Sequence, residues 1–328
     1  MGNTEKITIA QAINQALFQA MEKDENLIVM GEDVGKDGGV FRVTDGLYEK
    51  YGEKRVIDTP LAESGIIGTA IGLSVGGFRP VCEIQFMDFM YPALNQILAH
   101  VARYRNRSRG KYPIRMVIRM PFGGGIHPPE HHSESLETPL LHTAGLKVVA
   151  PSNPYDAKGL LLSALETDDP IIFMEPKKIY RAFREDVPKD YYKVEIGKAK
   201  VVKEGKDITI ITFGATVRTS LDAANSLSKE GYEAEVIDLR TLNPLDIETI
   251  LKSVEKTGRA VVVHEAPKIL GIGAEIAALI QEKALLSILA PVKRITGFDV
   301  PFPLPMLEEY YLPNKERIVK GALETLRY

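Results

Sequence analysis

Glu63 is the carboxylate whose place in the sequence most suggests chemistry. It stands where a predicted strand ends and a predicted helix begins. Ligands of parallel α/β sheets bind beyond the carboxyl ends of the strands, so Glu63 could contact a ligand there. A structural role is the alternative, because a carboxylate in the first turn of a helix also interacts favourably with the helix dipole. The position alone leaves both interpretations open.

A cluster of histidines is the second candidate. Four of the six histidines lie close together: His127, His131, His132 and His142. The first three stand in a loop over residues 121–133 that is rich in glycine and proline, and long irregular loops are often functional. A metal site is disfavoured, because Pro128 and Pro129 oppose a helical presentation and no HExxH or CxxC motif is present. Solvated histidines and a histidine that binds substrate or transfers protons both remain open.

Three further patterns are weaker. Phe89 follows a predicted strand and could line the site of a flat ligand, although plain core packing explains it as well. A lone GxG at Gly271 and Gly273 lacks the rest of a dinucleotide fingerprint and is more typical of a tight turn. A basic run favours a solvated helix end or a subunit contact over RNA binding, since its spacing scatters the charges around a helix: Arg103, Arg105, Arg107, Arg109 and Lys111.

Short apolar strands alternate with amphipathic helices, which is typical of an α/β fold with a mainly parallel sheet. The predicted strands lie at residues 27–30, 56–58, 79–84, 115–119, 147–150, 171–174, 208–213, 235–239, 260–264 and 292–296. The predicted helices lie at residues 9–22, 64–76, 91–104, 155–166, 217–229, 246–256 and 273–284. Periodicity is weak in the middle, so we predict a first domain over residues 1–187, a linker over 188–204 and a second domain over 205–328.

Glycines repeat every four residues along one predicted helix, at Gly68, Gly72 and Gly76. Each costs roughly 1 kcal/mol of helix stability relative to alanine. A helix face without side chains suggests close packing against another helix, which we expect to come from a second subunit.

The composition excludes several classes of protein. A net charge of −3 gives no electrostatic case for nucleic acid or an anionic membrane as the main partner. No apolar stretch is long enough to span a bilayer. Cys82 is the single cysteine, so no internal disulfide can form. Residues 1–11 lack the pattern of a signal or transit peptide, and we expect a cytoplasmic location.

Six segments resemble, in order, the beta subunit of the pyruvate and branched-chain 2-oxo acid dehydrogenase complexes. They are GEDV (31–34), DTPLAESG (58–65), EIQF (83–86), HSES (132–135), GLKVV (145–149) and DLRTL (238–242). The resemblance implies a thiamine-diphosphate-binding fold, with a pyrimidine-binding domain followed by a transketolase C-terminal-type domain. It implies oxidative decarboxylation of a 2-oxo acid and transfer of the acyl group to a lipoyl group.

The resemblance also implies roles for particular residues. Glu63 matches the carboxylate that contacts the pyrimidine nitrogen of thiamine diphosphate, and Phe89 matches the aromatic position beside that ring. Leu61 and Gln85 match positions at the same end of the cofactor. His132 matches the active-site histidine beside the reacting carbon.

Partners follow from the same resemblance. An alpha subunit would complete an α₂β₂ heterotetramer and hold the diphosphate through Mg²⁺. The expected Gly-Asp-Gly motif is absent from this chain, where the nearest match around Asp37 lacks the leading glycine. A second beta subunit and the lipoyl acyltransferase, docked on the C-terminal domain, are further expected partners. A structural potassium ion is implied near Val117 and residues 164–169, but Val117 and Ala164 offer no side-chain oxygen.

Two other functions are compatible with such a chain. Another transketolase-type thiamine enzyme would carry the diphosphate motif on the same chain. A non-catalytic subunit that only docks partners would not depend on Glu63. A nucleotide-binding oxidoreductase is disfavoured by the missing dinucleotide fingerprint.

Overall fold

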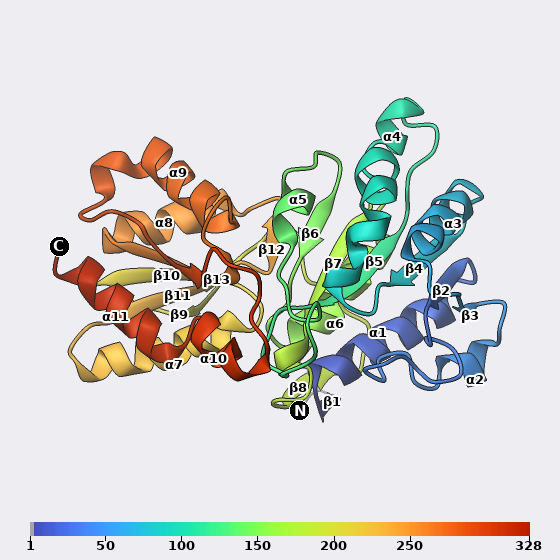
Figure 1. Cartoon of the computed structure of the whole chain (residues 1–328), viewed down its shortest axis with the longest axis horizontal. Coiled ribbons are helices and arrows are strands. Elements are labelled where there is room, and N and C mark those ends of the chain that lie inside the picture. The colour runs from blue at the N-terminus through green and yellow to red at the C-terminus, as the bar shows by residue number, and fades with distance from the viewer. Residues whose placement is uncertain (1–2) are drawn as a thin grey trace.

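The computed structural model describes residues 3–328 and consists of two α/β halves side by side (Figure 1). The N-terminal half lies to the right in this view and the C-terminus to the left. This arrangement confirms the predicted α/β fold class. Residues 1 and 2, which belong to the stretch considered for a targeting signal, lie outside the described residues.

The first half is built on a seven-stranded sheet with the order β12-β6-β7-β5-β4-β2-β3. Its strands are β2 (Leu27–Gly31), β3 (Val56–Asp58), β4 (Arg79–Glu83), β5 (Val117–Phe122), β6 (Lys147–Val149), β7 (Ile171–Pro176) and β12 (Thr241–Asn243). Neighbours run parallel, except that β12 pairs antiparallel with β6. The strands β2, β5 and β7 are buried throughout, as expected for a parallel sheet covered on both faces.

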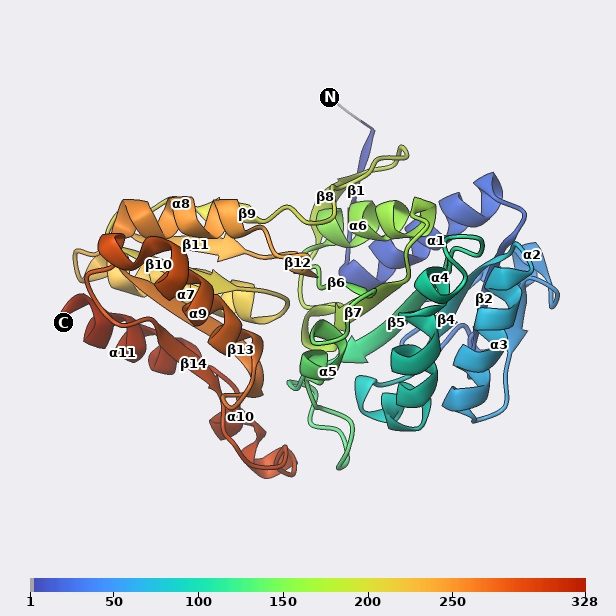
Figure 2. The same ribbon diagram turned by 90° about the horizontal axis from the view of Figure 1, so that it is seen from above.

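Helices cover both faces of this sheet (Figure 2). On one face α1 (Ile9–Lys23) packs against α6 (Pro154–Glu166), and on the other face α3 (Glu63–Val75) packs against β4. A capping box of Thr8 and Gln11 starts α1, and the side chain of Asn153 caps α6. Shorter helices are α2 (Leu47–Tyr51) and α5 (Glu137–Leu141).

The single long helix predicted over residues 91–104 is wrong. The chain instead forms a 3₁₀ helix over Met87–Ala93, a π-helix over Gln96–Val101 and a short α4 (Tyr104–Arg107). Pro92 lies inside the first of these and has no backbone N–H, so one helical hydrogen bond is missing within this segment. The periodicity of apolar residues was read correctly as helical, but it does not distinguish these three helix types.

The second half contains a five-stranded sheet with the order β14-β13-β10-β11-β9. Its strands are β9 (Lys200–Lys203), β10 (Ile208–Thr212), β11 (Ala234–Asp238), β13 (Ala260–Pro267) and β14 (Lys293–Gly297). Its helices are α7 (Thr216–Lys229), α8 (Ile247–Thr257), α9 (Ile272–Ala284), α10 (Glu308–Tyr311) and α11 (Lys315–Leu326). Within residues 3–328, no helix is both long and apolar enough to cross a membrane.

Several elements were not predicted. Helix α11 packs against α7, and β9 adds an antiparallel edge to β11 from within the segment predicted as the linker. A separate pair of antiparallel strands joins β1 (Thr4–Ile7) to β8 (Glu185–Pro188). Both β8 and β9 are short edge strands with charged residues, so their hydrophobic pattern is weak.

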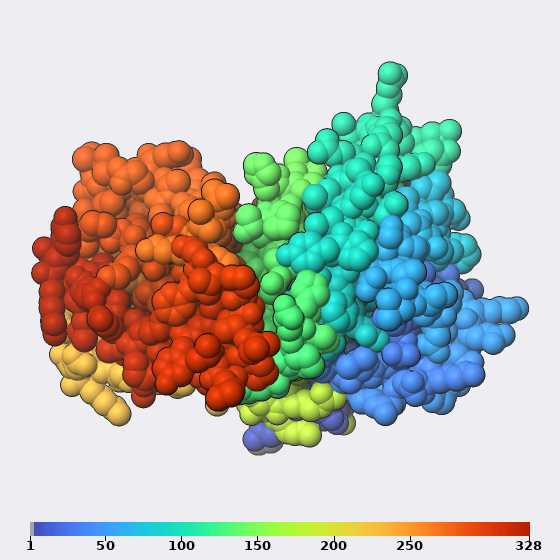
Figure 3. All heavy atoms as spheres, viewed as in Figure 1, coloured from blue at the N-terminus to red at the C-terminus, as the bar shows by residue number. Residues whose placement is uncertain are grey.

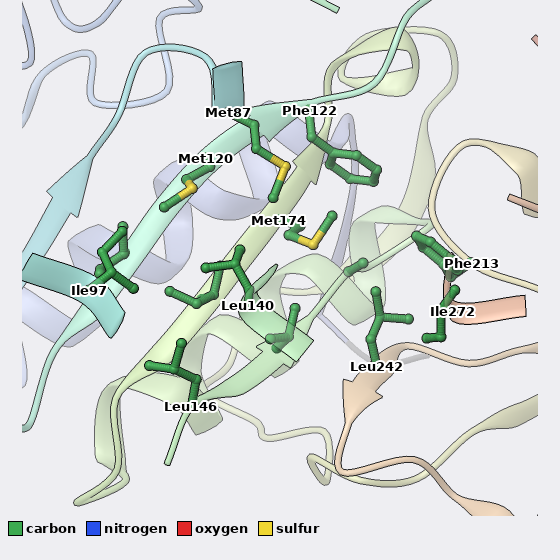
Figure 4. Close-up of a cluster of buried hydrophobic side chains, with 14 of the residues drawn as sticks. Met87, Ile97, Met120, Phe122, Leu140, Leu146, Met174, Phe213, Leu242 and Ile272 are labelled. Carbon is green, nitrogen blue, oxygen red and sulfur yellow. The ribbon is translucent and has the colours of Figure 1, made fainter. Parts of the chain in front are cut away.

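The two halves share a hydrophobic core (Figure 4). Phe122 and Met174 from the first half lie in one cluster with Phe213, Leu242 and Ile272 from the second. The rings of Phe122 and Phe213 stack with their centroids 6.4 Å apart. The carboxyl end of β5 therefore meets the carboxyl end of β10.

A buried ion cluster ties together the strands beneath this edge. Arg119 on β5 is fully buried and donates hydrogen bonds to Glu83 on β4 at 2.7 Å and to Glu175 on β7 at 2.7 and 2.9 Å. Tyr180 donates a further hydrogen bond to Glu175. Burial raises the pKa of Glu83, and the Arg119 guanidinium opposes that rise. Because the charges are paired, the cluster fixes the ends of three adjacent strands.

Candidate functional site

The candidate residues follow four neighbouring strands of the first sheet. Glu63 follows β3, Glu32 follows β2, Gln85 and Phe89 follow β4, and the loop with His132 follows β5. These strands are consecutive neighbours in the sheet and all run parallel. Their carboxyl ends therefore meet at one edge, which is where open parallel sheets bind ligands.

Glu63 begins helix α3 and is buried, with 8% of its surface exposed. A second carboxylate, Glu32, lies beside it at the end of β2 and is equally buried. Burial is the main cause that raises the pKa of Glu32, and the negative charge of Glu63 raises it further. A buried carboxylate beside a second negative charge favours a hydrogen-bond donor from a ligand.

Sequence analysis did not single out Glu32 as a site residue. One of its carboxylate oxygens, Oε1, is buried and has no hydrogen-bond partner among residues 3–328. The available signal was its position, since Glu32 directly follows the buried strand β2.

His132 and Phe89 are brought into contact. Their ring centroids lie 4.9 Å apart, and Phe86 approaches the same histidine at 4.6 Å, both edge to face. The Nδ1 atom of His132 lies 2.8 Å from the carbonyl oxygen of Glu130. Because a carbonyl can only accept, Nδ1 carries the proton in neutral His132 and the Nε2 lone pair stays available.

The neighbouring His131 has a different environment. Its ring stacks on Tyr91 with centroids 5.7 Å apart, whereas Phe89 lies 6.0 Å away. His131 also belongs to a group of potential metal ligands with Asp88 and Glu134, in which one ligand atom of each residue lies within 4.8 Å of the others. It is the single such group among residues 3–328. Tyr91 donates a hydrogen bond to Glu134 at 3.3 Å, and the Glu134 backbone N–H donates one to Asp88 at 3.0 Å, so two members already have partners.

Gln85 and Leu61 lie at the open side of the edge. The side-chain amide of Gln85 donates a hydrogen bond to Asp33 at 3.1 Å. Leu61 is 80% exposed, which is high for a large apolar side chain. An exposed leucine beside a buried carboxylate offers both an apolar and a polar contact to a ligand.

The segments implied for a potassium ion contain paired charges. Asp169 binds Lys147 at 2.8 Å and also Arg105, while Asp168 binds Arg115 at 2.6 Å. Side-chain cations of the chain itself thus neutralise these carboxylates. The ion pair with Asp169 also gives a structural role to Arg105, one member of the basic run at residues 103–111.

The glycine face of α3 is open in this chain. Nothing lies within 4 Å of a side-chain carbon added at Gly72, and the nearest atom at Gly68 is 3.9 Å away on Gln96. Gly72 and Gly76 are exposed. The glycines are therefore not required by packing within the described residues, which is consistent with a contact outside the chain.

The turn at Gly271 and Gly273 serves a buried histidine. Side-chain carbons added there would lie 2.6 and 2.9 Å from the His264 ring. Burial lowers the pKa of His264 to about 4, so it is neutral at pH 7. These glycines stand at the start of α9, where they admit the ring.

Two domain families match the sequence. The transketolase pyrimidine-binding domain matches residues 5–182, and the transketolase C-terminal domain matches residues 197–318. Solved structures agree in fold. A split-gene transketolase, described as an inactive beta4 tetramer, has a TM-score of 0.80 at 24% identity, covering 98% of this chain and 99% of that one. A transketolase mutant from Pichia stipitis has a TM-score of 0.70 at 13% identity, covering 98% of this chain and 46% of that one.

Curated relatives are similar over nearly the whole chain. The pyruvate dehydrogenase E1 component subunit beta of Staphylococcus epidermidis is 54% identical over 98% of this chain and 99% of its own length. The protein of the same name from Staphylococcus aureus is 52% identical over the same shares. The resemblance inferred from the six sequence segments is thereby confirmed. The chain belongs to the family of beta subunits of the thiamine-diphosphate-dependent 2-oxo acid dehydrogenase component, with the pyruvate dehydrogenase subunits among its relatives.

Proposed function

We propose that this chain supplies the pyrimidine half of a thiamine diphosphate site, in an enzyme that oxidatively decarboxylates a 2-oxo acid and passes the acyl group to a lipoyl group of the acyltransferase component. The main support is that site residues follow four adjacent parallel strands in a chain of this family: Glu63 follows β3, Glu32 follows β2, Gln85 and Phe89 follow β4, and His132 follows β5. Pyruvate is the substrate that the names of the relatives favour. A branched-chain 2-oxo acid remains the alternative.

The residues at this edge fit a flat heteroaromatic ring. Glu63 offers a buried carboxylate for a ring nitrogen, and beside it Glu32 has an oxygen that no group in the described part of the chain bonds. Phe89 offers an aromatic face, and Leu61 offers exposed apolar surface. Gln85 can turn its amide from Asp33 to a polar ring substituent. We assign these residues to the cofactor's pyrimidine end.

Two side chains carry the chemistry that this chain contributes. Thiamine diphosphate, when bound, supplies the nucleophilic carbon that attacks the 2-oxo group. Glu63 orients the pyrimidine through a hydrogen bond to its nitrogen. His132, whose Nδ1 is engaged by the Glu130 carbonyl, would use Nε2 to accept a proton or, when protonated, to bind the substrate carboxylate.

The diphosphate end of the site belongs to an alpha subunit in this proposal. Mg²⁺ requires oxygen ligands in near-octahedral geometry, usually one or two carboxylates with phosphate oxygens and water. The sequence has no Gly-Asp-Gly motif for that ion. We therefore propose an α₂β₂ assembly, with the glycine face of α3 against a second beta subunit and the acyltransferase on the C-terminal domain.

Three smaller assignments are also proposals. The division into residues 1–187, 188–204 and 205–328 is supported by family matches at 5–182 and 197–318. A structural potassium ion would need backbone carbonyls near Val117 and Ala164, which have apolar side chains. A cytoplasmic location is supported only by the single cysteine, Cys82.

The direct test is co-expression with a cognate alpha subunit, followed by assays of decarboxylation over a panel of 2-oxo acids. We expect thiamine-dependent activity with pyruvate or with branched-chain 2-oxo acids, and none from either subunit alone. Transfer of a two-carbon ketol group between sugars would instead indicate a transketolase. An assembly that binds the acyltransferase but decarboxylates nothing would indicate a docking subunit.

A further inference from the structure

The histidine loop, defined here as Gly123–Ser133, is held by carboxylates of the other half of the molecule. The backbone N–H of Gly124 donates to Glu265 at 3.0 Å. Glu308 accepts from two loop residues, from Gly125 and, at 3.1 Å, from His127. Glu265 lies on β13 and Glu308 starts α10, so both carboxylates belong to the C-terminal half. We call these hydrogen bonds between the loop backbone and the two carboxylates the grip. Figure 3 shows that half (orange to red) against the middle of the chain (green).

Consecutive glycines make this grip possible. A side-chain carbon at Gly123 would lie 2.4 Å from Glu265, and one at Gly124 would lie 2.9 Å from Glu308. At Gly125 the added carbon would lie 2.3 Å from Lys178, and φ there is +97°. The run of three glycines therefore lets the carboxylates and the lysine reach the loop backbone. Larger residues at Gly123 or Gly124 would collide with Glu265 or Glu308 of the C-terminal half.

The grip lies in a buried and charged environment. Glu308 is 1% exposed and Glu265 is 8% exposed. Burial raises the pKa of Glu265, while the hydrogen bond from Gly124 and the charge of Lys178 oppose that rise. Lys177 is 3% exposed, and its amino group has no hydrogen-bond partner within the described residues. Burial lowers the pKa of Lys177 to about 8, although Asp88, Glu265 and Glu308 favour its charged form.

The loop itself contains backbone strain. Both His127 and His131 adopt positive φ angles, of 52° and 63°, which non-glycine residues rarely adopt. Such strain persists only where surrounding contacts enforce it. One of the two hydrogen bonds that Glu308 accepts comes from the backbone N–H of His127, one of the two strained residues. External contacts thus hold the loop in a conformation that it would not keep alone.

We infer that Glu308 is a positioning residue for His132, with Glu265 in a supporting role: by binding the loop backbone at Gly124, Gly125 and His127, the C-terminal half fixes the ring of His132 against Phe86 and Phe89. The inference rests on the proposed function, because the role of His132 is part of that proposal. It assigns to the C-terminal half a part in forming the active site, in addition to any docking of partners.

Hydrogen exchange in the assembled enzyme tests the grip without reference to activity. In Glu308→Gln, one carboxylate oxygen becomes an NH₂ group that cannot accept from an amide. The amides of Gly125 and His127 should then exchange at least about tenfold faster, since local opening becomes easier. Glu309→Gln is the matched control, because Glu309 is exposed and approaches only the His127 ring, at 3.7 Å. Unchanged exchange in Glu308→Gln would overturn the inference.

A double-mutant cycle tests positioning. We expect Glu308→Gln to lower kcat by at least about tenfold with little change in melting temperature, and Glu308→Asp to recover part of the loss. In a His132→Ala background the same change should have almost no further effect. Multiplicative losses would show that Glu308 acts independently of His132. If the assembly has no decarboxylase activity but amide exchange is still faster in Glu308→Gln, the proposed function is wrong. The contact between Glu308 and the loop backbone is then still supported.

Discussion

The two sheets use their carboxyl edges differently. In the first sheet, the strand ends present Glu32, Glu63 and the loop with His132 toward a ligand. In the second sheet, the corresponding ends turn toward the first half. Asp238 at the end of β11 accepts a hydrogen bond from Ser152, and Glu265 near the end of β13 accepts one from Gly124. The same architecture thus gives a ligand site in one half and a structural contact in the other.

This difference shows that a strand end alone does not identify a catalytic residue. Asp238 and Glu63 are both buried carboxylates next to the end of a parallel strand. What separates them is their partners, since Asp238 is hydrogen-bonded to Ser152 and to the backbone of Arg240. Function has to be argued from the site rather than from the fold.

The largest effect should come from Glu63→Gln. If the carboxylate activates the cofactor, decarboxylation by the assembled enzyme should fall by roughly 10²–10⁴. Glu49→Gln is the matched control, because Glu49 also stands in the first turn of a helix but is exposed. Steady-state turnover of both variants separates the catalytic role from a helix-dipole effect. Turnover of Glu63→Gln within a few-fold of the wild type would return Glu63 to a structural role.

His132→Ala should have the next largest effect, a loss of turnover of about 10²-fold. The loop is polar and rich in glycine, so the fold should survive the change. His131→Ala is the neighbouring control and should cost less, since His131 stacks on Tyr91 rather than facing Phe86. A larger loss in His131→Ala would mean that the catalytic histidine was misassigned.

Gly72→Leu should disrupt assembly rather than chemistry. A leucine on the open glycine face would overpack the proposed contact with a second beta subunit, at about 1–3 kcal/mol. Asn225→Leu, an exposed position on α7, is the control for added surface leucine. We expect size-exclusion chromatography to show loss of the tetramer for Gly72→Leu only. A normal tetramer in both variants would place the glycine face away from the subunit contact.

The smallest expected effect concerns Asp238, at the carboxyl edge of the second sheet, and it depends on pH. Burial raises the pKa of Asp238 from 3.8 to about 7. A carboxyl whose pKa is raised in the folded state binds its proton more tightly there, so the stability it contributes is lost as the pH rises through about 7. The wild type should thus be more stable at pH 6 than at pH 8 by about 1 kcal/mol from this group.

Asparagine removes the ionisable carboxyl of Asp238, while its side-chain oxygen can still accept the hydrogen bond from Ser152. Thermal unfolding of Asp238→Asn should therefore show a smaller change between pH 6 and pH 8 than the wild type. An equal change in the two proteins would mean that other groups control the pH dependence.

Much of the fold could be predicted from the periodicity of apolar residues, but the pairing of strands between distant parts of the chain could not. Most strands of both sheets were anticipated, because buried parallel strands are short apolar runs between turn signals. The prediction failed around Pro92, where an apolar helical pattern conceals 3₁₀ and π geometry. It also missed β12, a three-residue strand from the second half that completes the first sheet. Such a contact joins residues about ninety positions apart, and no local pattern encodes it.

Several residues of the candidate site could be predicted from the sequence, but the residues that contact and position them could not. Glu63 and His132 were found from their position and from family resemblance. Glu32 and Glu308 were not, because their importance lies in what they approach: a second carboxylate and a loop backbone. The glycine run before Ile126 was visible in the sequence, but its purpose required the positions of Glu265 and Glu308.

The central claim is that this chain holds only half of a cofactor site, and calorimetry tests it most directly. Titration of thiamine diphosphate with Mg²⁺ into the purified chain should give no binding at micromolar cofactor. Addition of the alpha subunit should restore binding, because the diphosphate then meets a metal held by carboxylate and phosphate oxygens. Tight, Mg²⁺-dependent binding by this chain alone would contradict the half-site account and favour a complete site within a single polypeptide.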